Sequence, residues 1–143
     1  MLVLQSLWGW FESLRSAAEQ ASTHGFDGLE CNVMHPCLQG VDAAEVRQLL
    51  SAHGLVLILE ITTGGDYTPD LADGPQRHLQ QLEDLLGRAH ALEPLKINLI
   101  TGSDSWPEPE QHRFLEAVLD RSEAGPCPTV SYTHLRAHET SNH

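Results

Sequence analysis

The sequence has little of what nucleic-acid-binding and membrane proteins need. Its 143 residues carry 8 Lys and Arg against 20 Asp and Glu, for a formal net charge of −12. A surface that acidic repels phosphate backbones, and no Lys/Arg cluster offsets it, so nucleic acid is not an expected partner. No run approaches the roughly 20 apolar residues that a membrane helix needs. We therefore expect no membrane partner either.

The chain is also poor in cysteine and lacks a recognisable export signal. The segment 1–5 has no basic stretch followed by a long apolar one, which indicates a cytoplasmic protein. Cys31, Cys37 and Cys127 are too few, and odd in number, for a disulfide framework. His35 lies between the first two, but a zinc site would need a second pair of ligands. We expect buried thiols at these positions and no metal site.

What the sequence does have is a regular alternation of short apolar runs and amphipathic segments. The predicted strands are 2–7, 26–33, 55–61 and 95–100, and a fifth would begin at Cys127. Apolar residues recur at helical spacing over 11–21, 46–50, 79–89 and 114–119. Asp42 and Glu45 resemble a capping box at the start of the second helix. The continuous aliphatic run 55–61 is typical of a strand buried on both faces of a parallel sheet.

This alternation predicts parallel strands joined by right-handed crossovers, as in doubly wound sheets and in barrels. The turn after the first strand, Trp8-Gly9-Trp10, has no glycine-rich phosphate loop, which disfavours a dinucleotide-binding sheet. Polar residues at successive strand ends favour a barrel, whose active site lies on that face. A whole barrel takes roughly 250 residues. The expected fold is therefore α/β, the N-terminal half of a (β/α)8 TIM barrel, with about four βα units plus the start of a fifth strand.

Residues 1–128 resemble the sugar phosphate isomerase/epimerase family, which are xylose isomerase-like TIM barrels. The resemblance rests on the order of the βα units and on three motifs: Gly25-Phe-Asp-Gly-Leu-Glu30, Leu59-Glu60, and Ile97-Asn98-Leu-Ile-Thr-Gly102-Ser-Asp104-Ser-Trp106. It implies an enzyme that acts on a small sugar, sugar phosphate or polyol by proton transfer through an enediolate. It also implies a divalent metal ion in the full-length parent, held by later strands. Since those strands are missing, we expect this chain to hold no metal and to be inactive.

The resemblance and the strand ends together give a set of candidate carbohydrate-binding residues: Glu30, Glu60, Asn98, Asp104, Trp8, Trp106 and His35. The carboxylates can bind hydroxyls or position a proton, with capping or a salt bridge as the alternative. The indoles can stack on an apolar sugar face, with core packing as the alternative. The histidine lies in a strand-to-helix loop on the same side of the sheet, where a solvent-facing position is the alternative. No residue of this set is assigned as catalytic or as a metal ligand.

From Val130 onward the sequence changes character. The string Val-Ser-Tyr-Thr-His-Leu-Arg-Ala-His-Glu-Thr over 130–140 resembles, residue for residue, a translation of the transposase adapter used in DNA sequencing libraries. We therefore expect two parts: a partial barrel over 1–128 and a non-native, adapter-derived and disordered tail over 129–143. Glu139, which mimics an acidic ligand of the family, receives no role.

Two other functions stay open on the sequence alone. One is a non-catalytic half-barrel that acts as a binding or assembly module. The other is an abasic-site endonuclease built on the same barrel, which the charge of −12 disfavours. A half-barrel has two unpaired sheet edges, and we expect Val, Leu and Ile to line its inner face. Self-association through the open barrel edges is the expected consequence.

Overall fold

The computed structural model describes residues 1–64, 72–126 and 128–133, the last four of these by their backbone alone. Within these residues, five strands form one sheet: β1 (Leu4–Ser6), β2 (Gly28–Asn32), β3 (Val56–Thr62), β4 (Lys96–Thr101) and β5 (Thr129–Thr133). The helices between them are α1 (Leu14–Thr23), α2 (Ala43–Ala52), α3 (Pro75–Ala91) and α4 (Glu108–Glu123). A short 3-10 helix, η1 (Pro36–Leu38), precedes α2.

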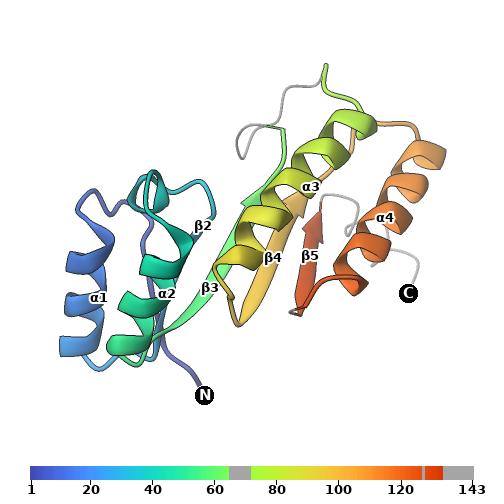
Figure 1. Cartoon of the computed structure of the whole chain (residues 1–143). Helices are drawn as coiled ribbons and strands as arrows, with labels where there is room; N and C mark the ends of the chain where they lie inside the picture. Colours follow the sequence, from blue (N-terminus) through green and yellow to red (C-terminus); the bar gives the residue numbers. More distant parts are fainter. Residues whose placement is uncertain (65–71, 127, 134–143) are drawn as a thin grey trace.

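The strand order distinguishes the two architectures that the sequence left open. Every neighbouring pair is parallel, and the order is β1-β2-β3-β4-β5. A doubly wound sheet reverses its order at a switch point, whereas here each strand pairs with the next one along the chain. Right-handed crossovers in one constant direction put all helices on one face. Figure 1 shows α1 to α4 together in front of the sheet. The predicted class, an α/β partial TIM barrel, is confirmed.

The core lies between the helices and one face of the sheet. Alternate residues of β3 and β4 are buried there, at positions 57, 59, 61, 97 and 99. The helices contribute small and large apolar side chains to the same cluster, among them Ala17, Ala21, Val46, Leu82, Phe114 and Val118. Burying a Leu or Ile side chain stabilises a fold by about 1.5–3 kcal/mol, so this layer anchors the sheet to its helices.

The opposite face, which would line a closed barrel, is only partly apolar. Its amino-terminal half carries Leu4, Val56 and Ile58, which are partly exposed. Its carboxyl-terminal half is mostly polar, with Ile100 of β4 as an aliphatic residue among the polar ones. The expectation that Val, Leu and Ile line this face is therefore wrong for most of the carboxyl-terminal half, because Leu59, Ile61 and Leu99 turn toward the helices.

The helix ends follow the predicted signals in part. Gly25 follows α1 with a φ of 76°, the left-handed conformation that glycine adopts without strain. Pro75 occupies the first turn of α3, where its missing N–H costs nothing. Asp42 is the N-cap of α2, but its side chain makes no capping hydrogen bond. The capping-box interpretation is wrong, since only its backbone carbonyl accepts, from the N–H of Val46.

Strand β5 corrects the prediction for the tail. Thr129–Thr133 pairs with β4 in a register that runs from Ile97↔Thr129 to Thr101↔Thr133. The expectation of a tail without a place in the fold is wrong for the backbone of this segment. The hydrogen bonds between β4 and β5 join backbone groups, and Thr, Val and Tyr favour the extended conformation. A strand can therefore form here without an alternation of apolar and polar side chains. Residues 134–143 of the predicted tail lie outside the described residues, as does Cys127, where the fifth strand was predicted to begin.

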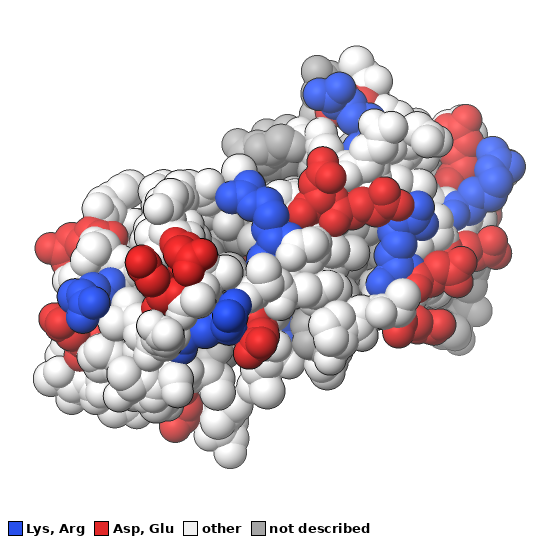
Figure 2. Space-filling model, in the orientation of Figure 1, with Lys and Arg blue, Asp and Glu red and all other residues white. Residues whose placement is uncertain are grey.

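The helical surface carries both signs of charge. Figure 2 shows acidic and basic side chains interspersed over this face, with no continuous basic area among the residues described. Some of them pair, as Arg121 does with Glu83 at 2.7 Å between α4 and α3. None of the described helices is long and apolar enough to cross a membrane.

Candidate functional site

The carboxyl ends of β2, β3 and β4 carry a row of polar side chains on the face away from the helices. The register places Asn32 beside Glu60, and Glu60 beside Asn98. Glu30 lies two residues before Asn32 and therefore points to the same face. All four are partly exposed, while the intervening residues are buried. The structure thus brings together three of the predicted residues and adds Asn32, which its spacing from Glu30 could have indicated.

The two carboxylates of this row are diagonal neighbours. Glu30 pairs with Ile58, two residues before Glu60. With strands about 4.8 Å apart and a rise of about 3.3 Å per residue, their Cβ atoms are separated by about 8 Å. A small hydroxylated ligand fits between two carboxylates at that spacing.

The two amides of the row are in different states. The Asn32 side chain donates to Thr62 Oγ1 at 3.2 Å and accepts from the Met34 N–H at 2.9 Å, which fixes its orientation. The Oδ1 atom of Asn98 is buried and has no hydrogen-bond partner within the described part of the chain. A buried polar atom left unsatisfied costs about 1–3 kcal/mol. Asn98 Oδ1 is therefore an unsatisfied acceptor beside Glu60, and a ligand hydroxyl would reach it only if neighbouring side chains moved, because the atom is buried.

A hollow of about 580 Å³ opens at this end of the sheet. Its lining comes from the ends of β1 to β3, the loop after β2, and α3: Ser6, Trp8, Glu30, Cys31, Asn32, Met34, His35, Pro36, Glu60, Thr62, Gln81, Asp84, Leu85 and Arg88. Trp8, Glu30, His35 and Glu60 are predicted residues that line it. The Trp8 side chain is 76% exposed, at the end of β1. This location suits a ring that covers a ligand.

His35 lines the hollow, but both of its ring nitrogens contact the backbone. Nδ1 accepts from the Cys37 N–H at 3.0 Å, and Nε2 lies 2.9 Å from the Leu7 carbonyl oxygen. Because Nδ1 accepts, the ring hydrogen sits on Nε2 and is donated to that carbonyl. His35 therefore ties the loop after β2 to the end of β1. A ligand can reach a ring nitrogen only by displacing one of these bonds.

Three predicted residues, Asn98, Asp104 and Trp106, lie outside the lining of the hollow. Trp106 is 7% exposed, and its Nε1 donates to the Asp73 carbonyl at 3.2 Å. Its ring packs edge-on against Phe114, with centroids 4.9 Å apart. This is the core-packing alternative. Asp104 is exposed in the loop before α4, and its carbonyl accepts from the Gln111 side chain at 3.2 Å.

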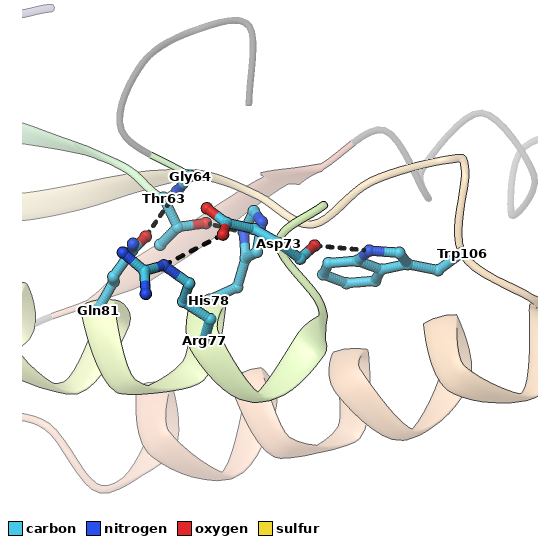
Figure 3. A network of polar contacts seen from close by, with 7 residues as sticks. All are labelled: Thr63, Gly64, Asp73, Arg77, His78, Gln81 and Trp106. Carbon is cyan, nitrogen blue, oxygen red and sulfur yellow. Dashed lines mark hydrogen bonds and ion pairs between the residues drawn. The ribbon is translucent and has the colours of Figure 1, made fainter. Parts of the chain in front are cut away.

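A buried polar network that was not predicted from the sequence begins just after β3. His78 of α3 is fully buried, and its Nδ1 lies 2.7 Å from Thr63 Oγ1 (Figure 3). The same Thr63 oxygen also contacts Thr101 Oγ1. His78 Nε2 has no partner among the residues described. Desolvation by burial lowers the pKa of His78, against the raising effect of Asp73. The spacing of His78 from Leu82 on the apolar stripe of α3 was the available signal.

Neighbouring contacts hold this network in place. The Gly64 N–H donates to Gln81 Oε1 at 2.7 Å, which joins the end of β3 to α3. Arg77, in the first turn of α3, pairs at 3.1 Å with Asp73, which precedes the helix. Gln81 also lines the hollow. The network therefore positions part of the wall of the site without contributing a titrating group to its interior.

The donors present do not fit a divalent metal ion. Across 1–64, 72–126 and 128–133, no three His, Cys, Asp or Glu side chains lie close enough to hold one. Protein sites for divalent metals use about four to eight ligands, of which the protein usually supplies three or more. Glu30 and Glu60 supply two carboxylates about 8 Å apart at Cβ, and both nitrogens of His35 are engaged. These residues by themselves do not form a metal centre.

No family model and no curated protein matches the chain. Its fold is similar to solved structures. One is the probable 3-DHS dehydratase AsbF of Bacillus anthracis, involved in petrobactin synthesis (TM-score 0.61, 16% identity, covering 86% of this chain and 47% of that one). Another is a D-psicose 3-epimerase in the presence of D-fructose, with a TM-score of 0.61 and 18% identity; the match covers 86% of this chain and 48% of that one. A third is a fusion of a xylose isomerase-like TIM barrel with a 4-hydroxyphenylpyruvate dioxygenase, with a TM-score of 0.65 and 16% identity; the match covers 93% of this chain and 22% of that one.

These likenesses establish the fold. The chain matches part of a TIM barrel. It spans less than half the length of each of these three proteins.

Proposed function

We propose that the chain is the substrate-binding first half of an enzyme that isomerises or epimerises a small sugar or polyol. The observation that carries this proposal is the row Asn32–Glu60–Asn98, with Glu30 beside it. The row lies at the carboxyl ends of the strands, where TIM barrels bind their substrates. The names of two similar structures, an epimerase and a dehydratase, support an enzyme of this general kind.

The row supplies the groups that such a reaction uses. Epimerisation beside a carbonyl breaks a C–H bond and passes through an enediolate, so a carboxylate must take and return a proton. Glu30 and Glu60 are the two carboxylates that line the hollow from the strand ends, and Asp84 lines it from α3. Asn98 Oδ1 accepts a hydroxyl hydrogen if neighbouring side chains move, and Trp8 covers an apolar face of the sugar.

The charges around the hollow favour a neutral sugar or polyol over a sugar phosphate. Glu30, Glu60 and Asp84 line it, against the single guanidinium of Arg88. That guanidinium already donates to Gln39 Oε1 and to Met34 Sδ, each at 3.0 Å. A phosphate would therefore meet an excess of negative charge at short range.

The complete reaction, in this proposal, needs residues that this chain does not supply. A divalent metal cofactor, if the parent enzyme uses one, is held by residues of the later barrel strands. The 143-residue chain by itself is inactive. The adapter-derived origin of residues 129–143 belongs to the same proposal. Sequencing the source DNA across codons 120–143 tests it, because an adapter origin requires the natural reading frame to diverge near codon 129.

The decisive experiment uses the uninterrupted gene. The full-length protein is incubated with ketoses and polyols in D2O, and deuterium at the epimerised carbon is followed by NMR. Glu30→Gln or Glu60→Gln should slow the exchange by at least about 100-fold, the usual contribution of a general base. Glu116→Gln, an exposed acid on α4, is the matched control and should have no effect.

The outcomes separate the alternatives. Sugar binding without exchange would identify a binding module. Cleavage of abasic DNA, with no sugar binding, would identify an endonuclease. Exchange that survives both Glu substitutions would overturn the roles given to these carboxylates.

A further inference from the structure

Two side chains at the carboxyl ends of β2 and β3 are joined by a hydrogen bond. Asn32 Nδ2 lies 3.2 Å from Thr62 Oγ1, and Asn32 Oδ1 lies 2.9 Å from the Met34 backbone nitrogen. Asn32 and Thr62 are both partly exposed, and both line the main hollow. Thr62 is two residues after Glu60, so these two side chains leave β3 on the same face. The contact between Asn32 and Thr62 is therefore part of the wall of the candidate site.

The Met34 backbone determines which way the Asn32 amide points. A backbone N–H can only donate a hydrogen bond, so the side-chain atom that it contacts must be the amide oxygen. The amide nitrogen of Asn32 consequently faces Thr62. Because an amide nitrogen can only donate, the Thr62 oxygen has to be the acceptor. The direction of the hydrogen bond between the two side chains thus follows from the backbone of the loop after β2.

The accepting role leaves the Thr62 hydroxyl with its own hydrogen still to donate. A threonine hydroxyl can accept from one partner and donate to another at the same time. Across 1–64, 72–126 and 128–133, the Thr62 hydroxyl makes no second hydrogen bond, so its hydrogen has no acceptor within these segments. Thr62 lines the hollow. The hydrogen is therefore available to a molecule that binds there.

This hydrogen complements the carboxylates of the polar row. When ionised, Glu30 and Glu60 have oxygens that accept and no hydrogen to donate. A sugar or polyol brings hydroxyl hydrogens for these carboxylates, and it also brings carbonyl or hydroxyl oxygens that need a donor. Thr62 and Glu60 are two residues apart on one strand, so about 7 Å separates their Cβ atoms. One small polyhydroxylated molecule can therefore contact both side chains.

We propose that Thr62 donates a hydrogen bond to a carbonyl or hydroxyl oxygen of the ligand in the hollow, and that Asn32 is the positioning residue that keeps the Thr62 hydrogen available to that ligand. The inference rests on the proposed function for the class of ligand, a small neutral sugar or polyol. Thr62 keeps its proton throughout, and no covalent bond forms or breaks at it. It contributes affinity and selection, because a ligand without an oxygen at this point leaves the donor unpaired.

Replacing Asn32 by Asp reverses this hydrogen bond and leaves the shape of the side chain nearly unchanged. One oxygen of Asp can still accept from the Met34 N–H. The other oxygen takes the place of the amide nitrogen and, when ionised, cannot donate. Thr62 then donates to the Asp carboxylate, and its hydrogen is withdrawn from the ligand. Asn32→Asp should therefore weaken ligand binding about as much as Thr62→Val, which removes the hydroxyl altogether.

The test uses the full 143-residue chain, because every residue that lines the hollow is present in it. The chain is labelled with nitrogen-15 and titrated with the D-ketohexoses and their alditols. Amide shifts give the dissociation constant and report whether each variant keeps the fold, and the Asn32 side-chain NH2 signals report on the contact itself. Thr62→Val and Asn32→Asp should each weaken binding by about 3–10-fold, the effect of one lost hydrogen bond. Thr62→Ser, which keeps the hydroxyl, should bind like the parent, as should Thr23→Val at an exposed position of α1.

A double-mutant cycle separates the positioning role of Asn32 from a structural one. In the Thr62→Val background, Asn32→Asp should change the dissociation constant by less than about twofold, because there is no hydroxyl left to redirect. The added negative charge is present in both backgrounds and cancels. Binding unaffected by Thr62→Val, a full effect of Asn32→Asp without the hydroxyl, or no binding of any probe would each overturn the inference. Binding that depends on Thr62, with no deuterium exchange in the full-length protein, would support the inference and overturn the proposed function.

Discussion

Gly28 and Gly87 should respond to the same substitution with opposite signs. Gly28 lies on β2, between β1 and β3. A Cβ atom built on it would lie 2.4 Å from the Val56 carbonyl oxygen and 2.5 Å from Val56 Cγ2. Real Cβ atoms essentially never approach within 3.0 Å. Val56 is paired to β2 in the sheet, so its backbone can retreat only by spreading the two strands. The polar row starts just above this point.

The magnitudes follow from these distances. Forcing a methyl group into a packed interior costs about 1–3 kcal/mol, and a contact with backbone belongs at the upper end of that range. Replacing Gly by Ala also restricts the unfolded chain, which offsets about 0.4–1 kcal/mol. Gly28→Ala should therefore destabilise the fold by about 2 kcal/mol. Gly87 is exposed in the middle of α3 with no atom within 4 Å of its Cβ position, so Gly87→Ala should stabilise by about 0.5–1 kcal/mol.

Urea unfolding followed by circular dichroism measures both variants against the parent chain. At about 4 °C per kcal/mol for a chain of this length, their melting temperatures should differ by roughly 10 °C. Gly87→Ala is the control for the general effect of alanine. A Gly28→Ala variant at least as stable as the parent would refute the reasoning, because the β2–β3 spacing would then have to be looser than described.

Three further predictions concern the core, the network and β5. The pKa of His78 is lowered in the folded chain. Between that pKa and about 6.5 the unfolded chain therefore binds more protons, and the free energy of unfolding falls as the pH is lowered. His78→Gln should make the free energy of unfolding, measured with urea between pH 5 and 8, less dependent on pH. Phe114→Ala, at a fully buried ring, should cost about 3–5 kcal/mol, whereas Leu119→Ala, at a position 48% exposed, should cost less than about 1 kcal/mol in the same assay. Deleting residues 130–143 should lower the melting temperature by several degrees, because β5 pairs with β4; an unchanged melting curve would contradict that pairing.

The order and type of the elements could be predicted because every βα unit has apolar residues at the spacing of a strand or a helix. The helix of α3, for example, follows directly from the spacing of Leu79, Leu82 and Leu86. Which face of a strand turns to the helices could not be predicted for 55–61, because a continuous aliphatic run has no alternation to read. The structure resolves this by burial, with Leu57, Leu59 and Ile61 on the helical side.

For the site, strand ends were informative and loops were not. Glu30, Glu60 and Asn98 meet because parallel strands align their carboxyl ends, a rule that needs no knowledge of side-chain contacts. The roles of His35 and Trp106 depend on hydrogen bonds to the carbonyls of Leu7 and Asp73, and no sequence pattern encodes such partners. The start of a fifth strand was predicted, but its continuation through 130–133 was missed for a related reason. The resemblance of 130–140 to a foreign sequence says nothing about whether its backbone can extend a sheet.

The sequential strand order also bears on how the chain acquires its structure. Each strand finds its neighbour one βα unit away, so closing each pair requires only a short loop of chain. Structure can therefore grow from the N-terminus as the chain is synthesised, with each new strand adding to a ladder that already exists. The free edge of β5 is then the growing end of the sheet. Any extended segment with good strand propensity that arrives there next in the chain is in a position to be accepted, whatever its origin.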